Sequence, residues 1–204
     1  MGGKRCRFRV RAVMAPVLLA VAVCLAPGAA AHAQGRGYEL WLGVLAHDVP
    51  IFGTHKESGP DINAELVLPS PISASAVAGI EPPLRWLLRP RPDIGVDANT
   101  AGDTSQAYIG LTWTADLASD MWSRGDGLFL DFSVGPALNN GQISTSDQNR
   151  KSLGSHVLIH SSVELGYRIE HVSVGLYLEH SSNAGLDDRN EGLTNVGVRL
   201  GFGF

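Results

Sequence analysis

Cysteine is nearly absent from this sequence, and long apolar runs are absent too. The 204 residues include two cysteines, Cys6 and Cys24, so a disulfide-stapled fold beyond residue 24 is excluded. No stretch supplies the roughly 18 or more consecutive apolar residues that a membrane-spanning helix needs. The length allows one domain and hardly two, and 24 glycines with 11 prolines are many for a helical protein. These absences disfavour a multidomain machine and a helical membrane protein.

Basic residues gather ahead of an apolar segment in the first part of the sequence. The apolar segment is 12–26, the small-x-small cleavage pattern is Ala31-His32-Ala33, and the basic residues are Lys4, Arg5, Arg7, Arg9 and Arg11. We expect a signal peptide over residues 1–33. A lipoprotein signal at Cys24 is the alternative, which Val23 before the cysteine disfavours. Removal of the signal leaves 11 basic against 20 acidic residues, which disfavours a nucleic-acid partner.

Segments with alternating apolar and polar side chains dominate the remaining sequence. In 172–182, Val172, Val174 and Leu176 share one face, whereas Ser173 and Glu179 lie on the other. Such alternation predicts β-strands with one apolar face. We expect eight strands, at residues 38–49, 61–68, 83–90, 106–117, 127–139, 155–168, 172–182 and 195–204. Residues 69–82, 90–104 and 141–153 are expected to be loops or turns, and no run predicts a helix.

Eight strands of about ten residues are typical of a small outer-membrane barrel, with an apolar outer face and a polar interior. The last predicted strand reaches Phe204 with apolar residues at every second position, as in many such barrels. Glu164, Arg168, Glu179 and Arg199 would point inside, where opposite charges can pair. A soluble β-sandwich is the alternative, because its core would use the same apolar residues. We predict an all-β, eight-stranded antiparallel transmembrane barrel over residues 34–204, in the outer membrane of a Gram-negative cell.

His180 and Ser182 interrupt the apolar row of the strand at 172–182. They continue the even-numbered face of Leu176 and Leu178, which places them toward lipid near the membrane edge. Polar groups there are costly unless they lie near headgroups or have a function. Residues i and i+2 have Cβ atoms roughly 6.5–7 Å apart, so the imidazole can take the hydroxyl proton. The pattern indicates an ester hydrolase with Asn183 or nearby backbone amides holding the oxyanion; the alternative is a polar girdle beside a turn-capping serine.

A longer motif extends this pair. His180-x-Ser182-Asn183-Ala184-Gly185-Leu186, then Asn190-x-Gly192, then a final strand ending in Phe204, resembles the lipid A 3-O-deacylase (PagL) family across residues 176–204. The resemblance implies an esterase that removes the 3-position acyl chain of lipid A, or of lipopolysaccharide, in the outer leaflet and without a cofactor. It implies His180 as general base, Ser182 as nucleophile and Asn183 at the oxyanion site. Assembly as a homodimer stays open.

The third residue of the family pattern is different in this sequence. The acid that orients the histidine is expected fourteen residues after it, where this chain has Thr194, on the same lipid-facing row as Val196. A hydroxyl can accept a hydrogen bond from the imidazole, but it does not stabilise imidazolium as a carboxylate does. Glu191 is the substitute acid that we predict, with Asp187 and Asp188 behind it; a solvated acidic loop is the alternative for all three. A structural barrel with impaired catalysis is therefore the second hypothesis for function.

Other polar and aromatic residues give weaker indications of function. His156 and His160 share a face with Glu164 and raise the question of a metal site, but a row of interior polar side chains explains them better, and we expect no metal. His47, Asp48 and His55 lie near a predicted turn without a recognisable partner. The four tryptophans are expected at the membrane interface or in the core: Trp41, Trp86, Trp113 and Trp122.

Overall fold

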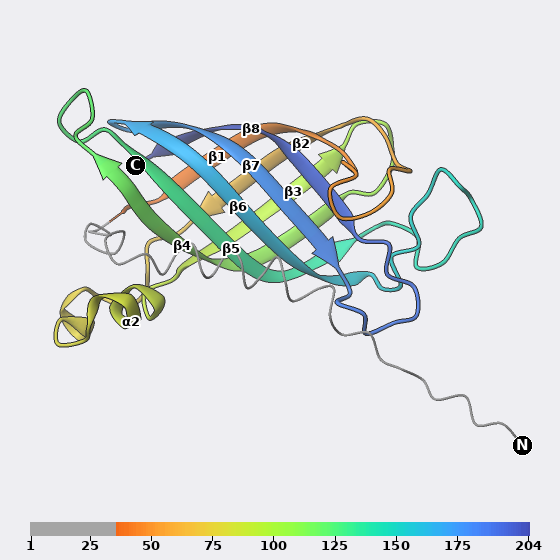
Figure 1. The fold of residues 1–204 in the computed structure, drawn as a ribbon, viewed down its shortest axis with the longest axis horizontal. Helices are drawn as coiled ribbons and strands as arrows, with labels where there is room; N and C mark the ends of the chain where they lie inside the picture. Colours follow the sequence, from red (N-terminus) through yellow and green to blue (C-terminus); the bar gives the residue numbers. More distant parts are fainter. Residues whose placement is uncertain (1–35) are drawn as a thin grey trace, which may run out of the picture.

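The chain forms a closed antiparallel barrel of eight strands, shown by a computed structural model that describes residues 36–204 (Figure 1). Neighbouring strands pair in chain order, and β1 pairs with β8 to close the barrel. The strands are β1 Glu39–Ala46, β2 Pro60–Val67, β3 Arg91–Asn99, β4 Gln106–Ser119, β5 Gly127–Asn139, β6 Val157–Ile169, β7 Val172–Ser182 and β8 Leu193–Gly203. Closure removes the free strand edges and confirms the predicted fold class over the sandwich.

The predicted signal peptide and both cysteines lie outside the described residues. Within residues 36–204, no helix has the length and apolar character required to cross a membrane.

The alternation along each strand separates an apolar outside from a polar inside. On β7, Val172, Val174 and Leu176 are about half exposed, whereas Tyr177 and Glu179 are buried. The same division holds on the other strands, because successive side chains of a strand point to opposite faces. An apolar outer face with a filled polar interior is the pattern of a small barrel in lipid.

The interior is filled by charged and aromatic side chains. The guanidinium of Arg199 pairs with Glu65 and Glu164 and stacks over the ring of Tyr177, with its Cζ 3.7 Å from the ring centroid. Glu179 accepts hydrogen bonds from Asn195 and Gln106. Buried charges persist where they are paired and hydrogen-bonded, as the sequence predicted for Arg199 and Glu164. Side chains therefore fill the interior of the barrel.

One predicted strand is wrong. Residues 83–90 were expected to be extended, but Pro82–Leu87 forms the short helix α2, preceded by the 3₁₀ turn Ser75–Val77. Leu84, Leu87 and Leu88 have the i, i+3, i+4 spacing of a helical face, and proline is favoured in the first turn of a helix. The Trp86 indole donates a hydrogen bond to the Thr114 carbonyl, and the Trp113 indole donates to the Leu87 carbonyl. These bonds hold α2 against the outside of β4.

The missing strand is β3, in a segment that was expected to be a loop. Ile94 and Val96 face outward, while Arg91, Asp93 and Asp97 are buried in the interior. Two prolines and a glycine within 90–95 give the segment the composition of a loop, but the pairing partners β2 and β4 supply its hydrogen bonds on both sides. Pairing on both edges thus outweighs the local signals.

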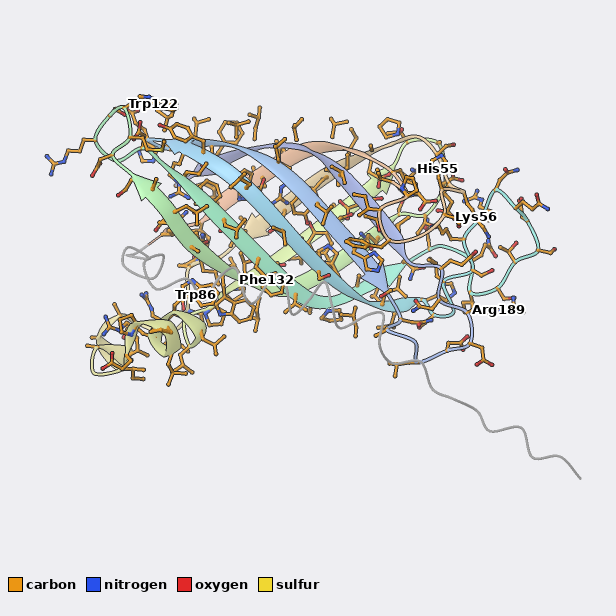
Figure 2. All side chains as sticks on the ribbon, viewed as in Figure 1. His55, Lys56, Trp86, Trp122, Phe132 and Arg189 are labelled. Carbon is orange, nitrogen blue, oxygen red and sulfur yellow. The ribbon has the colours of Figure 1, made fainter. Side chains whose placement is uncertain are left out.

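The barrel has two unlike ends. One end carries the C-terminus, α2 and the two-residue turn between β6 and β7 (Figure 1). The other end, here called the loop end, carries loops 47–59, 100–105, 140–156 and 183–192. Figure 2 shows His55, Lys56 and Arg189 at the loop end, and Trp122 at the opposite end. His180 and Ser182 lie on the last residues of β7, at the loop end.

Candidate active site

His180 points out of the barrel and is held by Thr194. The two residues lie directly opposite each other on β7 and β8, and Nδ1 of His180 is 2.8 Å from Oγ1 of Thr194. Both side chains are on the even-numbered face that the sequence assigned to lipid. The hydroxyl at position 194 therefore occupies the place where the family pattern has an acid, and it contacts the imidazole directly.

Gly192 lets the chain pass close to the other side of the same imidazole. Its φ is 52°, in the left-handed region, and a Cβ at this position would lie 2.8 Å from Cε1 of His180. Both facts require glycine. The geometry thus explains why the Asn-x-Gly motif has glycine at position 192.

Ser182 is the last residue of β7 and faces the same side as His180. Its side chain is largely buried, and across the sheet Ser182 pairs with Ile159 of β6. Within residues 36–204, Ser182 Oγ makes no hydrogen bond to His180 or to any other group. Ser182 and His180 are two residues apart on the outer face of β7, and a hydrogen bond between a serine and a histidine in such a position often forms only when substrate binds.

An apolar groove of about 550 Å³ opens on the outer wall; its lining includes Asn183, which follows Ser182, and Ile159, which pairs with Ser182 across the sheet, but not Ser182 itself. Its apolar side is formed by Val134 and Pro136 of β5 and by Val157 and Ile159 of β6, and Asn183 and Leu186 lie on its loop side. The groove volume lies within the range of small-molecule sites. Because the groove faces the lipid side of the barrel, it is suited to an acyl chain.

Asn183 organises the loop that follows Ser182. Its side-chain amide donates to the carbonyls of Leu153 and Arg189, at 3.0 and 2.6 Å, and its Oδ1 accepts from the Gly185 N–H. Both amide protons are therefore engaged in the loop. Ala184 has φ 55°, and in the described part of the chain its N–H donates no hydrogen bond. This amide is an available donor two residues after Ser182.

Glu191 lies in the same loop but is engaged elsewhere. One carboxylate oxygen pairs with Lys56, and the other accepts the Ser152 N–H at 2.6 Å. Burial raises its pKa, but these hydrogen bonds and the charge of Lys56 outweigh burial and lower the pKa of Glu191. The carboxylate that we predicted to orient His180 thus fastens loop 183–192 to loops 47–59 and 140–156, while Thr194 makes the contact with His180.

Sequence reasoning missed a buried set of charges at the loop end, which we call the clasp: His47, Asp48, Glu57, Asp61 and Lys151. His47 Nδ1 lies 2.8 Å from Asp61, its Nε2 lies 3.2 Å from Glu57, and Lys151 Nζ lies 2.7 Å from Asp48. All five side chains are almost completely buried. The five residues come from β2 and from loops 47–59 and 140–156, so only the fold brings them together.

His47 and Glu57 of the clasp are charged at neutral pH. Burial lowers the pKa of His47, but the hydrogen bonds and negative charges of Asp61 and Glu57 prevail and raise it to about 9. Burial raises the pKa of Glu57, but hydrogen bonds from His47 and from the backbone N–H groups of Lys151 and Thr104 lower it to about 2. The imidazolium is therefore held between two carboxylates.

The suggested histidine metal site does not assemble. His160 is buried in the interior, with Nε2 3.1 Å from Glu179, and its ring stacks on Tyr108. His156 is exposed before the start of β6. Within residues 36–204, no group of three or more histidine, cysteine or acidic side chains is arranged to hold a metal ion.

Comparisons with known proteins agree with the geometry. The sequence model of one family, described as lipid A 3-O-deacylase (PagL), matches residues 77–203, which is more than half of the chain. The crystal structure of the outer membrane enzyme PagL is similar in fold, with TM-score 0.59 and 18% identity, over 80% of this chain and 98% of that one.

Two further barrels match more weakly. Neisserial surface protein A gives TM-score 0.47 at 11% identity, over 84% of this chain and all of that one. The N-terminal β-barrel domain of Pseudomonas aeruginosa OprF gives TM-score 0.44 at 14% identity, with the same coverage. No curated protein sequence matches the chain. From the family match and the eight-stranded barrel, we conclude that the chain belongs to the PagL lipid A 3-O-deacylase family and is an outer-membrane β-barrel.

Proposed function

We propose that this protein is a serine esterase that hydrolyses the 3-O-linked acyl chain of lipid A. The observation that carries the proposal is the pairing of His180 with Thr194 beside Ser182, on the outer wall at the loop end. A lipid ester can reach this side of the barrel from the membrane. Export by a signal peptide over residues 1–33 belongs to the same proposal, as does a loop end that faces the cell exterior.

In the proposed reaction, Ser182 Oγ attacks the carbonyl carbon of the ester while His180 Nε2 takes the hydroxyl proton. The bond between the acyl carbon and the sugar's 3-oxygen then breaks, and His180 gives the proton to that departing oxygen. In the second step water attacks the acyl carbon while His180 takes its proton; the bond to Ser182 Oγ breaks, Oγ takes the proton back from His180, and the fatty acid is released. Nδ1–H donates to Thr194 Oγ1 throughout, which keeps Nε2 free to accept the proton.

The oxyanion is the negative oxygen that forms during both steps. We assign its stabilisation to the turn at Asn183, where the Ala184 N–H is an available donor. Asn183 supports this turn through its bonds to Leu153, Arg189 and Gly185. A fixed backbone donor stabilises developing charge without reorganisation cost. The groove lined by Ile159 and Asn183 would receive the scissile acyl chain.

The neutral hydroxyl of Thr194 favours a second candidate function, an impaired or inactive structural barrel on the same scaffold. Loss of the orienting acid can cost about 10⁴ in kcat when the tautomer is misplaced. The contact of Thr194 with Nδ1 avoids the wrong tautomer, but imidazolium receives less stabilisation than a carboxylate would provide. The expected activity is therefore lower than that of a site with an acid at position 194.

Mass spectrometry of lipid A from cells that express the protein tests the proposal. The wild type should remove one ester-linked acyl chain, and Ser182→Ala should not. Ser181→Ala is the matched control, because Ser181 points into the barrel and donates to Gln106 Oε1 at 2.7 Å. Unchanged lipid A with folded wild type in the outer membrane would contradict the esterase. Activity that appears only with Thr194→Glu would then support the inactive barrel.

A further inference from the structure

Phe52 of loop 47–59 contacts the imidazole of His180. The two ring centroids are 5.4 Å apart, and the ring planes meet at 76°, an edge-to-face arrangement. Thr194 contacts Nδ1 of the same imidazole, and Gly192 passes close to Cε1. The imidazole is thus enclosed by residues from two loops and one strand.

Loop 47–59 is attached to β8 next to the residue that binds His180. The Val49 N–H donates to the carbonyl of Thr194 at 2.7 Å, and the Asp48 N–H donates to Oδ1 of Asn195 at 3.0 Å. A displacement of the start of this loop would therefore disturb Thr194 directly. The position of loop 47–59 is therefore coupled to the hydrogen bond between Thr194 and His180.

The clasp fixes the rest of the loop. Asp48 Oδ2 accepts the backbone N–H groups of Lys56 and Glu57, at 2.6 and 3.1 Å, while its Oδ1 binds Lys151. These bonds draw the two ends of the 49–55 segment together. Phe52 lies in the middle of this segment and remains about half exposed. Because the ring is half exposed, burial of its apolar surface contributes little to stability. Its contact with His180 is therefore a better explanation of its position.

We propose that Phe52 is a positioning residue for His180, holding the imidazole against Thr194 in place of the missing carboxylate. The inference rests on the proposed esterase function. The phenyl ring restricts rotation of the imidazole and excludes water from it. Edge-to-face is a favoured geometry for two rings, so the contact favours the imidazole orientation that is bonded to Thr194.

Kinetics of purified full-length protein on a lipid A substrate test the role. Phe52→Ala should lower kcat roughly 10-fold to 100-fold with little change in KM, because a misplaced general base costs mainly the chemical step. Phe52→Tyr should retain most of kcat. Ile51→Ala is the matched control: Ile51 is also half exposed on this loop, and it should leave kcat within about twofold of the wild type.

A double substitution separates positioning from simple loss of stability. If Phe52 compensates for the missing acid, Phe52→Ala should cost much less kcat when Thr194 is replaced by Glu than in the wild type. Equal costs in the two backgrounds would overturn the proposal, as would wild-type kcat in Phe52→Ala when Ser182→Ala is inactive.

A spectroscopic measurement keeps the inference testable even if no hydrolysis is found. In Ser182→Ala protein in detergent micelles, NMR should detect a slowly exchanging His180 Nδ1 proton. Adding Phe52→Ala should accelerate its exchange at least tenfold, whereas adding Ile51→Ala should not. Unchanged exchange in the Phe52 variant would overturn the positioning role without bearing on the esterase function.

Discussion

Three histidines of this barrel lie in surroundings of unlike chemistry. In the interior His160 lies 3.1 Å from the Glu179 carboxylate, and in the clasp His47 lies between Glu57 and Asp61. On the outer wall His180 has a neutral hydroxyl as its partner, 2.8 Å away. Of these three, only His180 lies on the lipid side, two residues from a serine whose hydroxyl has no hydrogen-bond partner within residues 36–204.

The difference between carboxylate and hydroxyl partners follows the location of charged side chains in the barrel. The buried ion pairs lie inside the barrel, as for Arg199 with Glu65 and Glu164, or in the clasp, as for Lys151 with Asp48. The outer site instead combines a hydroxyl, an imidazole and an aromatic ring, which cost less to keep beside lipid. We assign a structural role to His47 and His160, whose partners are carboxylates. We assign the catalytic role to His180, whose partner is a hydroxyl. Four experiments can break or sharpen this division.

Replacing each histidine in turn should give the largest contrast. His180→Ala should lower kcat/KM by about 10³ or more, because it removes the proposed base while the barrel still folds. His160→Gln should reduce stability yet leave the activity of the folded protein unchanged, since it contacts the interior only. Lipid A deacylation, normalised to heat-modifiable folded barrel on gels, measures both. Equal losses of activity in the two variants would contradict the distinction between a catalytic His180 and a structural His160.

The clasp should respond strongly to loss of a single charge. Lys151→Met leaves the Asp48 carboxylate buried without its cation, which typically costs about 3–5 kcal/mol. We expect loop 47–59 to open, with faster hydrogen exchange and lower kcat. The matched control is Lys56→Met, since the Lys56–Glu191 pair is about a quarter to a third exposed and should contribute at most about 1 kcal/mol. Similar exchange in both variants would contradict a structural role for the clasp.

Thr194→Glu should convert the outer histidine into a carboxylate-paired one. We expect an increase in kcat of about tenfold or more, because a carboxylate stabilises imidazolium, with about 10⁴ as the upper limit. The matched variant Thr194→Gln supplies a neutral acceptor and should give no comparable increase. Steady-state rates of the three proteins decide the point, and equal rates for Glu and Gln would show that charge at this position is unimportant.

The stability of loop 47–59 should also depend on pH. Because the folded pKa of His47 is raised from 6.5 to about 9, its stabilisation is complete below about pH 6.5 and is lost as pH rises through about 9. The folded pKa of Glu57 is lowered from 4.5 to about 2, so its contribution is complete above about pH 4.5 and is lost as pH falls through about 2. Loop 47–59 should therefore be most protected near pH 4.5–6.5.

Hydrogen exchange, expressed as protection factors for the Lys56 and Glu57 amides, checks this window. We expect protection to fall by at most about tenfold per pH unit between pH 6.5 and 9. His47→Gln should remove the alkaline dependence, because Glu57 and Asp61 would then face a group that does not titrate. An alkaline fall that persists in this variant would assign the effect to another group.

Sequence patterns sufficed where the local signal and the fold agree. The alternation over 127–139 and 172–182 predicted β5 and β7 with their bounds, and for β7 also the outward face. The same parity placed His180, Ser182 and Thr194 together on the outer wall. At 83–99 the patterns failed, because a helical spacing of leucines was read as a strand and prolines concealed β3.

The sequence by itself determined the barrel class, the lipid-facing parity and the motif of His180, Ser182 and Asn183, because a strand's side chains alternate with a period of two. Only the tertiary structure decided which groups surround that motif. Closure of the barrel brings loops distant in sequence to one end, so Glu191 binds Lys56, the clasp assembles from three segments, and Phe52 contacts His180. Such contacts depend on strand register and on loop paths, which no local periodicity encodes.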